Sequence, residues 1–397
     1  MEWYSRYGQA RAIIFLFSRV VTEKSALSKV RLNLSSTFGD PTLPRTWSGT
    51  TFNIYSELVR RDQCGTTFDA NISESLRLVL SLLTVPFYGN LDKGRSPFRR
   101  HACAMKVAKT TQSALSNHTL HTGTLALPFL RRPPNQYHYI ISDTTWNLWS
   151  SHATNMGGYS DKMIAFFDKI EGEAYAQADH IFPMGHYVKD NLINHYKVPV
   201  SKITVVGTGL GVIKPFTGEK DYSIRKVLFA AKDRFKDKGG ELVIATFREV
   251  LKRDPSIKLT IVGTSGGDSF NSPNIEVLGF LPLEDLQRLF DTHSLFLMPA
   301  LNEPWGLVYL EAMACKMPIM GLNRNSFPEL AGHGKYGFGI DDSNPTLVAD
   351  LLIKAFDDPT TLKMMGERAQ TYCLSKFSWE KTVGRILSVI EGESKNV

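Results

Sequence analysis

The sequence predicts an α/β protein with two doubly wound domains, each a parallel sheet covered by helices on both faces. A chain of 397 residues is too long for one ordinary hydrophobic core, so two domains are expected. Its 43% hydrophobic and 21% charged residues are normal for a globular protein. In the second half, short apolar runs alternate with helical patterns, which is typical of parallel strands joined by helices.

The second half shows this alternation most clearly. Strands are expected at residues 226–231, 258–263, 274–280, 294–299, 318–323 and 337–340, and helices at 240–254, 283–293, 307–317 and 347–358. Ligands of such folds bind at the carboxyl ends of the strands, so the loops after these strands are the first candidates for a site.

The first half is harder to interpret. We expect a strand at 30–38, a helix at 48–61, a strand at 137–143, and a long helix from residue 161 that leads into a strand at 180–183. Residues 64–125 give only weak signals, and residues 1–28 are interpreted as a peripheral arm. The stretch 206–220 is rich in glycine and polar residues and predicts a domain boundary, while 377–392 has the pattern of an amphipathic helix.

The positive charge is unevenly placed. The formal net charge is +7, and no acid occurs between Asp92 and Asp143. The cations of this interval are Lys93, Arg95, Arg99, Arg100, Lys106, Lys109, Arg131 and Arg132. Such a field favours an anionic partner, either a phosphorylated or acidic substrate or a membrane surface, and a solvated basic face is the alternative. No recognised nucleic-acid-binding module appears, so no nucleic-acid partner is expected.

The four cysteines, Cys64, Cys103, Cys315 and Cys373, lie far apart and form no Cys-x-x-Cys pair. This spacing argues against a disulfide framework or a structural zinc site, and no cluster of acids predicts another metal site. The apolar run at 12–17 is much shorter than a membrane span and lacks a small-residue cleavage site. We therefore expect a cytoplasmic protein, with the inner face of the membrane as the alternative location.

The stretch MPALNEPWGLVYLEAM, residues 298–313, carries two glutamates beside apolar surface. It is interpreted as the end of a strand, a loop with Glu303 and a helix with Glu311. At the start of such a helix the N–H groups of Gly306, Leu307 and Val308 have no partner within the helix, and with the helix dipole they form an anion site. Glu311 lies about 7 Å further along the helix, at roughly 1.5 Å per residue. Carboxylates accept hydrogen bonds from hydroxyl groups, so the two acids fit a nucleotide-sugar.

A second segment, LFAAKDRFKDKGG at 228–240, is a strand followed by a basic loop that ends in glycines. Lys232, Arg234 and Lys238 are expected around the carboxyl end of that strand, on the same rim as Glu303. Cations at this place can stabilise a diphosphate. A solvated basic turn would explain the loop alone, but its combination with the two glutamates favours the functional interpretation.

These motifs resemble those of the retaining GT-B glycosyltransferases of family four. The family's donor domain carries a basic residue, then Lys-Gly at the head of a helix and later Glu-x7-Glu, which here are Lys232, Lys238-Gly239 and Glu303 with Glu311. Residues 207–212 resemble the linker motif between the domains, and 48–61 resemble the glycine loop and first helix of the acceptor domain. The likeness covers most of 170–390 and more loosely 30–62.

The resemblance implies a GT-B fold, in which two Rossmann-like domains face each other across a cleft. It implies an acceptor domain at 1–206, a donor domain at 207–376, and a helix at 377–397 that crosses back to the first domain. The implied reaction is transfer of a sugar from a UDP-, GDP- or ADP-linked donor with retention at the anomeric carbon. No metal or cofactor besides the donor is implied.

The resemblance also implies roles for individual residues. Lys238 and either Lys232 or Arg234 stabilise the leaving diphosphate, Glu303 binds hydroxyls of the donor sugar, and Glu311 holds the ribose. Gly49 lets its loop close on the phosphates.

Asp143 stands where the family often has a histidine, and it is a candidate contact to the sugar or the acceptor. The glycine pair that commonly faces the donor sugar is replaced by Asn323-Arg324-Asn325-Ser326, which leaves the donor sugar open.

Other functions stay open at this stage. An epimerase of the same fold would use carboxylates and a histidine around the sugar, and a non-catalytic subunit would bind the nucleotide-sugar without turnover. A dinucleotide dehydrogenase is disfavoured because GTGLGV is not followed by a helix with a ribose-binding acid. The acceptor, whether a glycan, a lipid-linked sugar or a small molecule, is not predicted.

Overall fold

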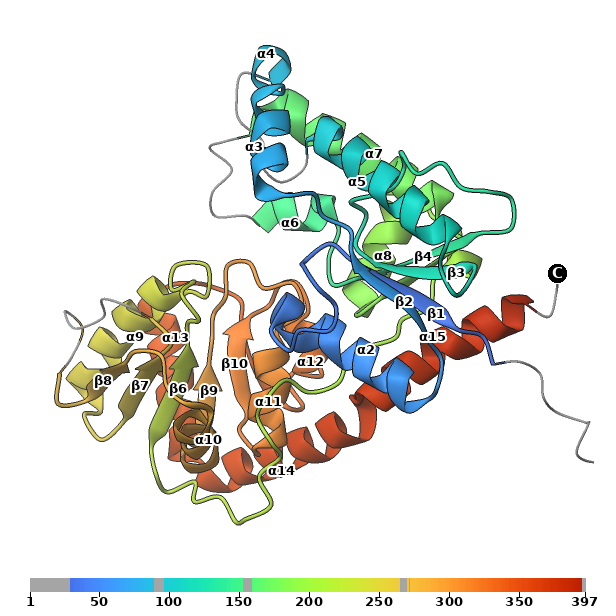
Figure 1. Cartoon of the computed structure of the whole chain (residues 1–397). Helices are drawn as coiled ribbons and strands as arrows, with labels where there is room; N and C mark the ends of the chain where they lie inside the picture. The colour runs from blue at the N-terminus through green and yellow to red at the C-terminus, as the bar shows by residue number, and fades with distance from the viewer. Residues whose placement is uncertain (1–28, 89–95, 153–158, 265–269, 271, 395–397) are drawn as a thin grey trace, which may run out of the picture.

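The computed structural model describes residues 29–88, 96–152, 159–264, 270 and 272–394, which form two α/β domains (Figure 1). Residues 1–28, expected to be a peripheral arm, lie outside the described residues.

The N-terminal domain is built on a sheet of five parallel strands in the order β2-β1-β3-β4-β5. Its strands are β1 (Leu32–Ser36), β2 (Cys64–Asp69), β3 (His118–Thr122), β4 (Tyr137–Ser142) and β5 (His180–Pro183). Its helices are α2 (Thr50–Arg60), α3 (Glu74–Leu82), α4 (Val85–Tyr88), α5 (Pro97–Gln112), α6 (Trp146–His152), α7 (Asp161–Gln177) and α8 (His186–Asn194), with a short turn of helix, η1 (Thr46–Gly49), before α2 and another, η2 (Val200–Lys202), after α8. The expected strands at 30–38, 137–143 and 180–183 and the helices at 48–61 and from 161 are confirmed.

The C-terminal domain has six parallel strands in the order β11-β10-β9-β6-β7-β8. The strands are β6 (Lys226–Ala230), β7 (Lys258–Val262), β8 (Ile275–Leu278), β9 (Leu295–Leu297), β10 (Ile319–Leu322) and β11 (Gly337–Ile340). The helices are α9 (Gly240–Arg253), α10 (Leu283–Thr292), α11 (Leu307–Ala314), α12 (Phe327–Leu330), α13 (Pro345–Asp357), α14 (Pro359–Lys376) and α15 (Trp379–Ser394). Every strand and helix expected between 226 and 358 is present.

The strands without a clear sequence signal owe their place in the sheet to polar partners. His121 and His138 lie side by side on β3 and β4, with Nε2 of the first 2.9 Å from Nδ1 of the second. Asn33 on β1 donates to Oγ1 of Thr119 on β3 over 3.3 Å. These contacts give buried polar side chains hydrogen-bond partners across neighbouring strands, although Nε2 of His138 has none among the described residues. Burial lowers the pKa of His138 to about 3, so the pair is a neutral part of the structure.

The basic stretch at 93–132 does not form a continuous charged surface. Arg99 and Arg100 are buried within α5, where Arg99 binds the side chain of Asn71 and Arg100 donates to the carbonyls of residues 124 and 127. Arg132 pairs with Asp179 at 2.5 Å, and Lys106 donates to the carbonyl of Asn71. The cations at 93 and 95 lie outside the described residues. Lys109 and Arg131 are exposed. Two of the described cations therefore lie inside the domain, and Lys106 and Arg132, although exposed, bond to neighbouring protein groups.

The last two helices lead from the C-terminal domain to the N-terminal one (Figure 1). Helix α14 packs against α11, and α15 packs against α2. Arg61 on α2 donates to the carbonyl of Glu380 over 2.8 Å, and Arg60 pairs with the Glu380 carboxylate at 3.2 Å. Gln63 donates to Glu391 over 3.0 Å. These contacts join α15 to the C-terminal end of α2 and the turn that follows it.

The four cysteines are unpaired thiols, and three of them are buried. In the described part of the chain, no group of three or more His, Cys, Asp or Glu side chains is arranged to hold a metal ion. None of the helices in that part combines the length and the apolar character that a membrane crossing requires.

Candidate active site

Lys238 and Glu303 form an ion pair at the carboxyl ends of the neighbouring strands β6 and β9. Their side chains are only 9% and 15% exposed. Gly239, with φ +82°, follows the lysine, and a side chain there would overlap the carbonyl of Pro299. The glycine therefore lets the two loops touch, and the N–H of Leu301 donates to the carbonyl of Asp237 over 2.8 Å.

Arg234 supports the same contact from the side. Its guanidinium donates to the carbonyl of Asn302 and to the Asp237 carboxylate, both over 3.2 Å, and lies 3.9 Å from the Glu303 carboxylate. Because these hydrogen bonds hold the loop that carries Glu303, Arg234 helps to position that loop.

Lys232 instead reaches the N-terminal domain. Its Nζ donates to Oγ of Ser48 over 3.1 Å. Ser48 (φ +54°) precedes Gly49 (φ +89°) in the left-handed turn before α2. The glycine loop expected at Gly49 thus lies opposite the basic loop, with a cation between them.

The N-terminus of α11 adjoins the Lys238–Glu303 pair. Gly306 caps this helix with φ +81°, and a Cβ there would lie 2.6 Å from the Tyr309 ring and 3.2 Å from Cγ of Glu303. Among the described residues, no hydrogen bond uses the N–H groups of Gly306, Leu307 or Val308. These amides therefore keep their capacity to bind an anion beside Glu303 and Lys238.

Glu311 is buried in α11 and faces the segment that joins the domains. One of its carboxylate oxygens accepts hydrogen bonds from the N–H groups of Val212 at 2.7 Å and Ile213 at 3.2 Å. A side chain at Gly211 would overlap that oxygen, so the linker glycine allows this contact. Burial raises the pKa of Glu311, and the two N–H donors and the charge of Lys232 oppose that rise. Glu311 thus holds the linker between the domains in place, a role that the sequence does not predict. The second carboxylate oxygen takes part in neither of these hydrogen bonds.

Asp143 follows β4 and faces Glu303 from the other domain. Burial raises the pKa of its carboxyl to about 6, the negative charge of Glu303 adds to the rise, and a hydrogen bond from the Trp47 side chain opposes it. The residue keeps some contact with solvent, but protein from both domains surrounds the carboxyl. Two carboxylates that repel each other across the domains are typical of a functional site.

The domains also touch through residues without any sequence signal. The hydroxyl of Tyr187 on α8 contacts the carbonyls of both Asp143 and Pro304. The side-chain amide of Asn302 donates to the carbonyl of Trp149 over 3.4 Å. These contacts depend on how the two domains meet, which no local pattern encodes.

A histidine and several aromatic side chains around β4 take part in packing. His138 is paired within the sheet, and Trp146 is fully buried against Trp149 and Phe167. Trp146 and Phe167 belong to a small buried core between α6 and α7, and the partly buried Trp149 packs against it.

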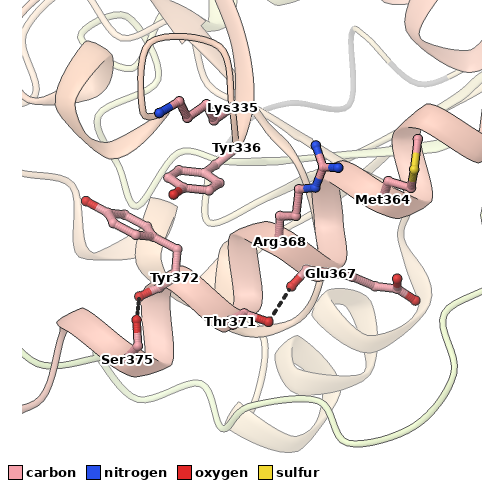
Figure 2. Close-up of a pocket in the computed structure, with 8 residues that line it drawn as sticks. All are labelled: Lys335, Tyr336, Met364, Glu367, Arg368, Thr371, Tyr372 and Ser375. Atoms are coloured by element: carbon pink, nitrogen blue, oxygen red, sulfur yellow. Dashed lines mark hydrogen bonds between the residues drawn. The ribbon is translucent and has the colours of Figure 1, made fainter.

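A surface recess of about 670 Å³ lies on the far side of the C-terminal domain, between α14 and the turn before β11 (Figure 2). The rings of Tyr336 and Tyr372 stack there with centroids 4.3 Å apart. None of the predicted site residues lines it. A second hollow, of about 510 Å³, lies between the domains and is lined by His186, Glu329 and Arg385 among others. The candidate site is therefore defined by its side chains and amides, not by either of these two hollows.

Comparisons with known proteins agree with this architecture. Residues 219–372 match the model of the family described as Glycosyl transferases group 1. The D-inositol 3-phosphate glycosyltransferase of Paenarthrobacter aurescens is 31% identical over 215 residues, 49% of this chain and 52% of that protein. A GDP-mannose-dependent monoacylated alpha-(1-6)-phosphatidylinositol monomannoside mannosyltransferase of Corynebacterium glutamicum is 27% identical over 172 residues, 40% and 45% of the two chains. The chain thus matches about half the length of these relatives.

Solved structures match nearly the whole chain. Sucrose-phosphate synthase from Thermosynechococcus elongatus has a TM-score of 0.68 at 14% identity, covering 93% of this chain and 100% of that one. WaaG, a glycosyltransferase involved in lipopolysaccharide biosynthesis, has a TM-score of 0.63 at 12% identity, covering 91% and 100%. Identities this low show the fold alone. The protein has the fold of the GT-B glycosyltransferases, and its C-terminal domain matches the group 1 family model.

Proposed function

We propose that the protein is a retaining glycosyltransferase that moves a sugar from a nucleoside-diphosphate sugar to an acceptor bound by the N-terminal domain. The observation that carries this proposal is the Lys238–Glu303 pair beside the N-terminus of α11. A buried lysine, a carboxylate and unused helix amides at one place supply a cation, a hydroxyl acceptor and an anion site.

In this proposal the diphosphate lies against the N–H groups of Leu307 and Val308. Lys238 and Lys232 flank it and stabilise the negative charge that develops as the sugar leaves. Closure of the turn at Ser48 and Gly49 places the Lys232 cation over the phosphates. Such stabilisation requires no metal ion, because the cations and amides carry the leaving group's charge.

Glu303 accepts hydrogen bonds from hydroxyls of the donor sugar, and the second oxygen of Glu311 accepts from the ribose. Asp143 faces the sugar from the acceptor side. Retention at the anomeric carbon is part of the proposal and is supported by the resemblance of the Glu303–Glu311 motif. The transition state would be oxocarbenium-like, as in glycoside hydrolysis, with a diphosphate as the leaving group.

The names of similar proteins suggest which donors to test. One relative is described as GDP-mannose-dependent, and the Anabaena protein Alr3699/HepE, with a TM-score of 0.63 and 14% identity, was solved with UDP-glucose. We propose a UDP-, GDP- or ADP-linked donor and an acceptor that is a glycan, a lipid-linked sugar or a small molecule.

The location that we propose is the cytoplasm. A contact of region 93–132 with an anionic membrane is a narrower proposal, since Lys109 and Arg131 are exposed, while the exposed Lys106 and Arg132 already bond to protein groups. Sedimentation with anionic and neutral vesicles tests that contact.

The direct test of the activity is a thermal-shift screen of UDP, GDP, ADP and their sugars, followed by donor turnover with wild type and Glu303→Ala. Turnover that is lost in the variant supports the proposal. Binding without turnover in either protein would favour a non-catalytic subunit. Nucleotide release that requires an acceptor separates transfer from epimerisation, which releases no nucleotide.

A further inference from the structure

Tyr187 has a hydroxyl that contacts both domains at the candidate site. It lies in the first turn of α8, and the hydroxyl contacts the carbonyls of Asp143 in its own domain and of Pro304 in the other. Asp143 carries the carboxyl on the acceptor side, and Pro304 directly follows Glu303. One side chain therefore joins the backbone beside each of the two facing acids.

The chemistry of these contacts makes the hydroxyl necessary. Two carbonyl oxygens repel each other, and the single proton of the hydroxyl, shared between them in a three-centre hydrogen bond, lets both lie close to it. The tyrosine stays a donor at working pH, because burial, with the charges of Asp143 and Glu303 adding to it, raises its pKa well above the ordinary value. The ring of Tyr187 packs against the hydrophobic core, and the hydroxyl is the group of this side chain that bonds the backbone of both loops.

The residues before Tyr187 also contact the C-terminal domain. A Cβ at Gly185 would lie 2.6 Å from the Trp305 ring, so the indole packs directly on the backbone. The N–H of His186 donates to the Glu329 carboxylate over 2.7 Å. The start of α8 is thus fitted to the loop that carries Glu303.

We propose that Tyr187 is a positioning residue, which sets the separation of Asp143 and Glu303 when the two domains meet. This inference rests on the proposed function, because the separation matters for catalysis only if acceptor and donor react between these acids. Tyr187 would therefore affect kcat, the rate at which the bound substrates react. The diphosphate site on Lys238 and α11 belongs to one domain and would form without it.

The test compares Tyr187→Phe with a matched control, Tyr222→Phe. Tyr222 is also buried and donates its hydroxyl to a carbonyl, that of Lys316 over 2.6 Å, but within the C-terminal domain. With whichever of UDP-glucose and GDP-mannose is turned over, Tyr187→Phe should lower kcat roughly tenfold and leave the donor KM within about twofold. The control should leave both constants unchanged.

Hydrogen exchange provides a readout that needs no substrate. In Tyr187→Phe the amides of 143–145 and 301–305 should exchange faster together, whereas Tyr222→Phe should leave both segments unchanged. An unchanged kcat, or faster exchange in neither or only one of these segments, overturns the inference. If the wild type turns over no nucleotide-sugar, the proposed function fails, and the exchange experiment still decides whether Tyr187 joins the two loops.

Discussion

Lys238 and Glu303 are 65 positions apart in the sequence and form an ion pair that is almost closed to solvent. A pair of this kind costs desolvation energy on both sides, so its presence at the ends of two adjacent strands is weak evidence for stability alone. It is better explained as a prepared site. An arriving phosphate can take over the ammonium of Lys238, while the carboxylate turns to sugar hydroxyls.

The two remaining cations of the basic loop should behave differently. Lys232→Ala removes the charge that reaches Ser48 and should weaken UDP or GDP binding about tenfold. Arg234→Ala removes the support of the Asn302 carbonyl, and it should lower donor turnover with nucleotide affinity within about twofold. Titration calorimetry together with turnover separates the two effects. Equal losses of affinity in both variants would show that Arg234 also binds the diphosphate.

Asp143 should make the stability of the protein depend on pH. Its pKa is about 6 when folded and near 3.8 when unfolded, so its contribution is complete below pH 3.8 and is lost as the pH rises through 6. Asp143→Asn avoids that loss. The free energy of unfolding of the variant, minus that of wild type, should therefore be larger at pH 7.5 than at pH 4.5, by at most about 3 kcal/mol. Urea unfolding at the two pH values measures this, and a difference that does not vary with pH would contradict it.

Charge and shape at Glu303 can be separated by Glu303→Gln. The amide keeps the size of the side chain and removes the partner of Lys238, so nucleotide binding should be retained or improved. Turnover should fall about 100-fold, because the sugar loses a charged acceptor. The control is Glu276→Gln, an exposed acid on β8. Turnover near the wild-type rate in Glu303→Gln would remove Glu303 from the mechanism.

The N-terminal sheet should be sensitive to acid through His180. Burial lowers the pKa of this imidazole to about 4, and the charge of Lys202 adds to the shift. Stability from the neutral ring is therefore complete above pH 6.5 and is lost as the pH falls towards 4. His180→Gln, which can still pair with Thr204, should lose less stability over this interval than wild type, by up to about 3 kcal/mol. The control is His101→Gln on the exposed face of α5. Urea unfolding between pH 7 and pH 4 measures the stability of each protein, and the same loss of stability in all three would contradict the role of His180.

The C-terminal domain could be predicted closely because its strands are continuous apolar runs. Leu228 and Phe296, for example, lie fully buried at the centre of the sheet. The helices between the strands have regular amphipathic patterns. Gly239 and Gly306 stand at the starts of α9 and α11, beside the loops that carry the candidate site residues. The two glutamates and the lysines could be found for the same reason, since they follow strands whose ends share one rim.

The N-terminal domain resisted prediction because its sheet is partly polar. β2 has the sequence CGTTFD and is only half-buried along its length. β3 has the sequence HTLHT, in which His121 and both threonines are buried. The sequence predicts a charged surface that includes Arg99 and Arg100, but both side chains are buried. Tyr187 carried no signal, because its role depends on a contact between domains.

The central claim is that a diphosphate binds at the N-terminus of α11 beside Lys238. The most direct measurement is calorimetric titration of UDP, GDP and ADP into wild type, Lys238→Ala and the control Lys252→Ala, whose side chain pairs with Glu249 on the exposed face of α9. The account predicts that one of the nucleotides binds wild type and the control equally, and binds Lys238→Ala at least about tenfold more weakly. Equal affinity in all three proteins, or no binding of any of the three nucleotides to wild type, would contradict it.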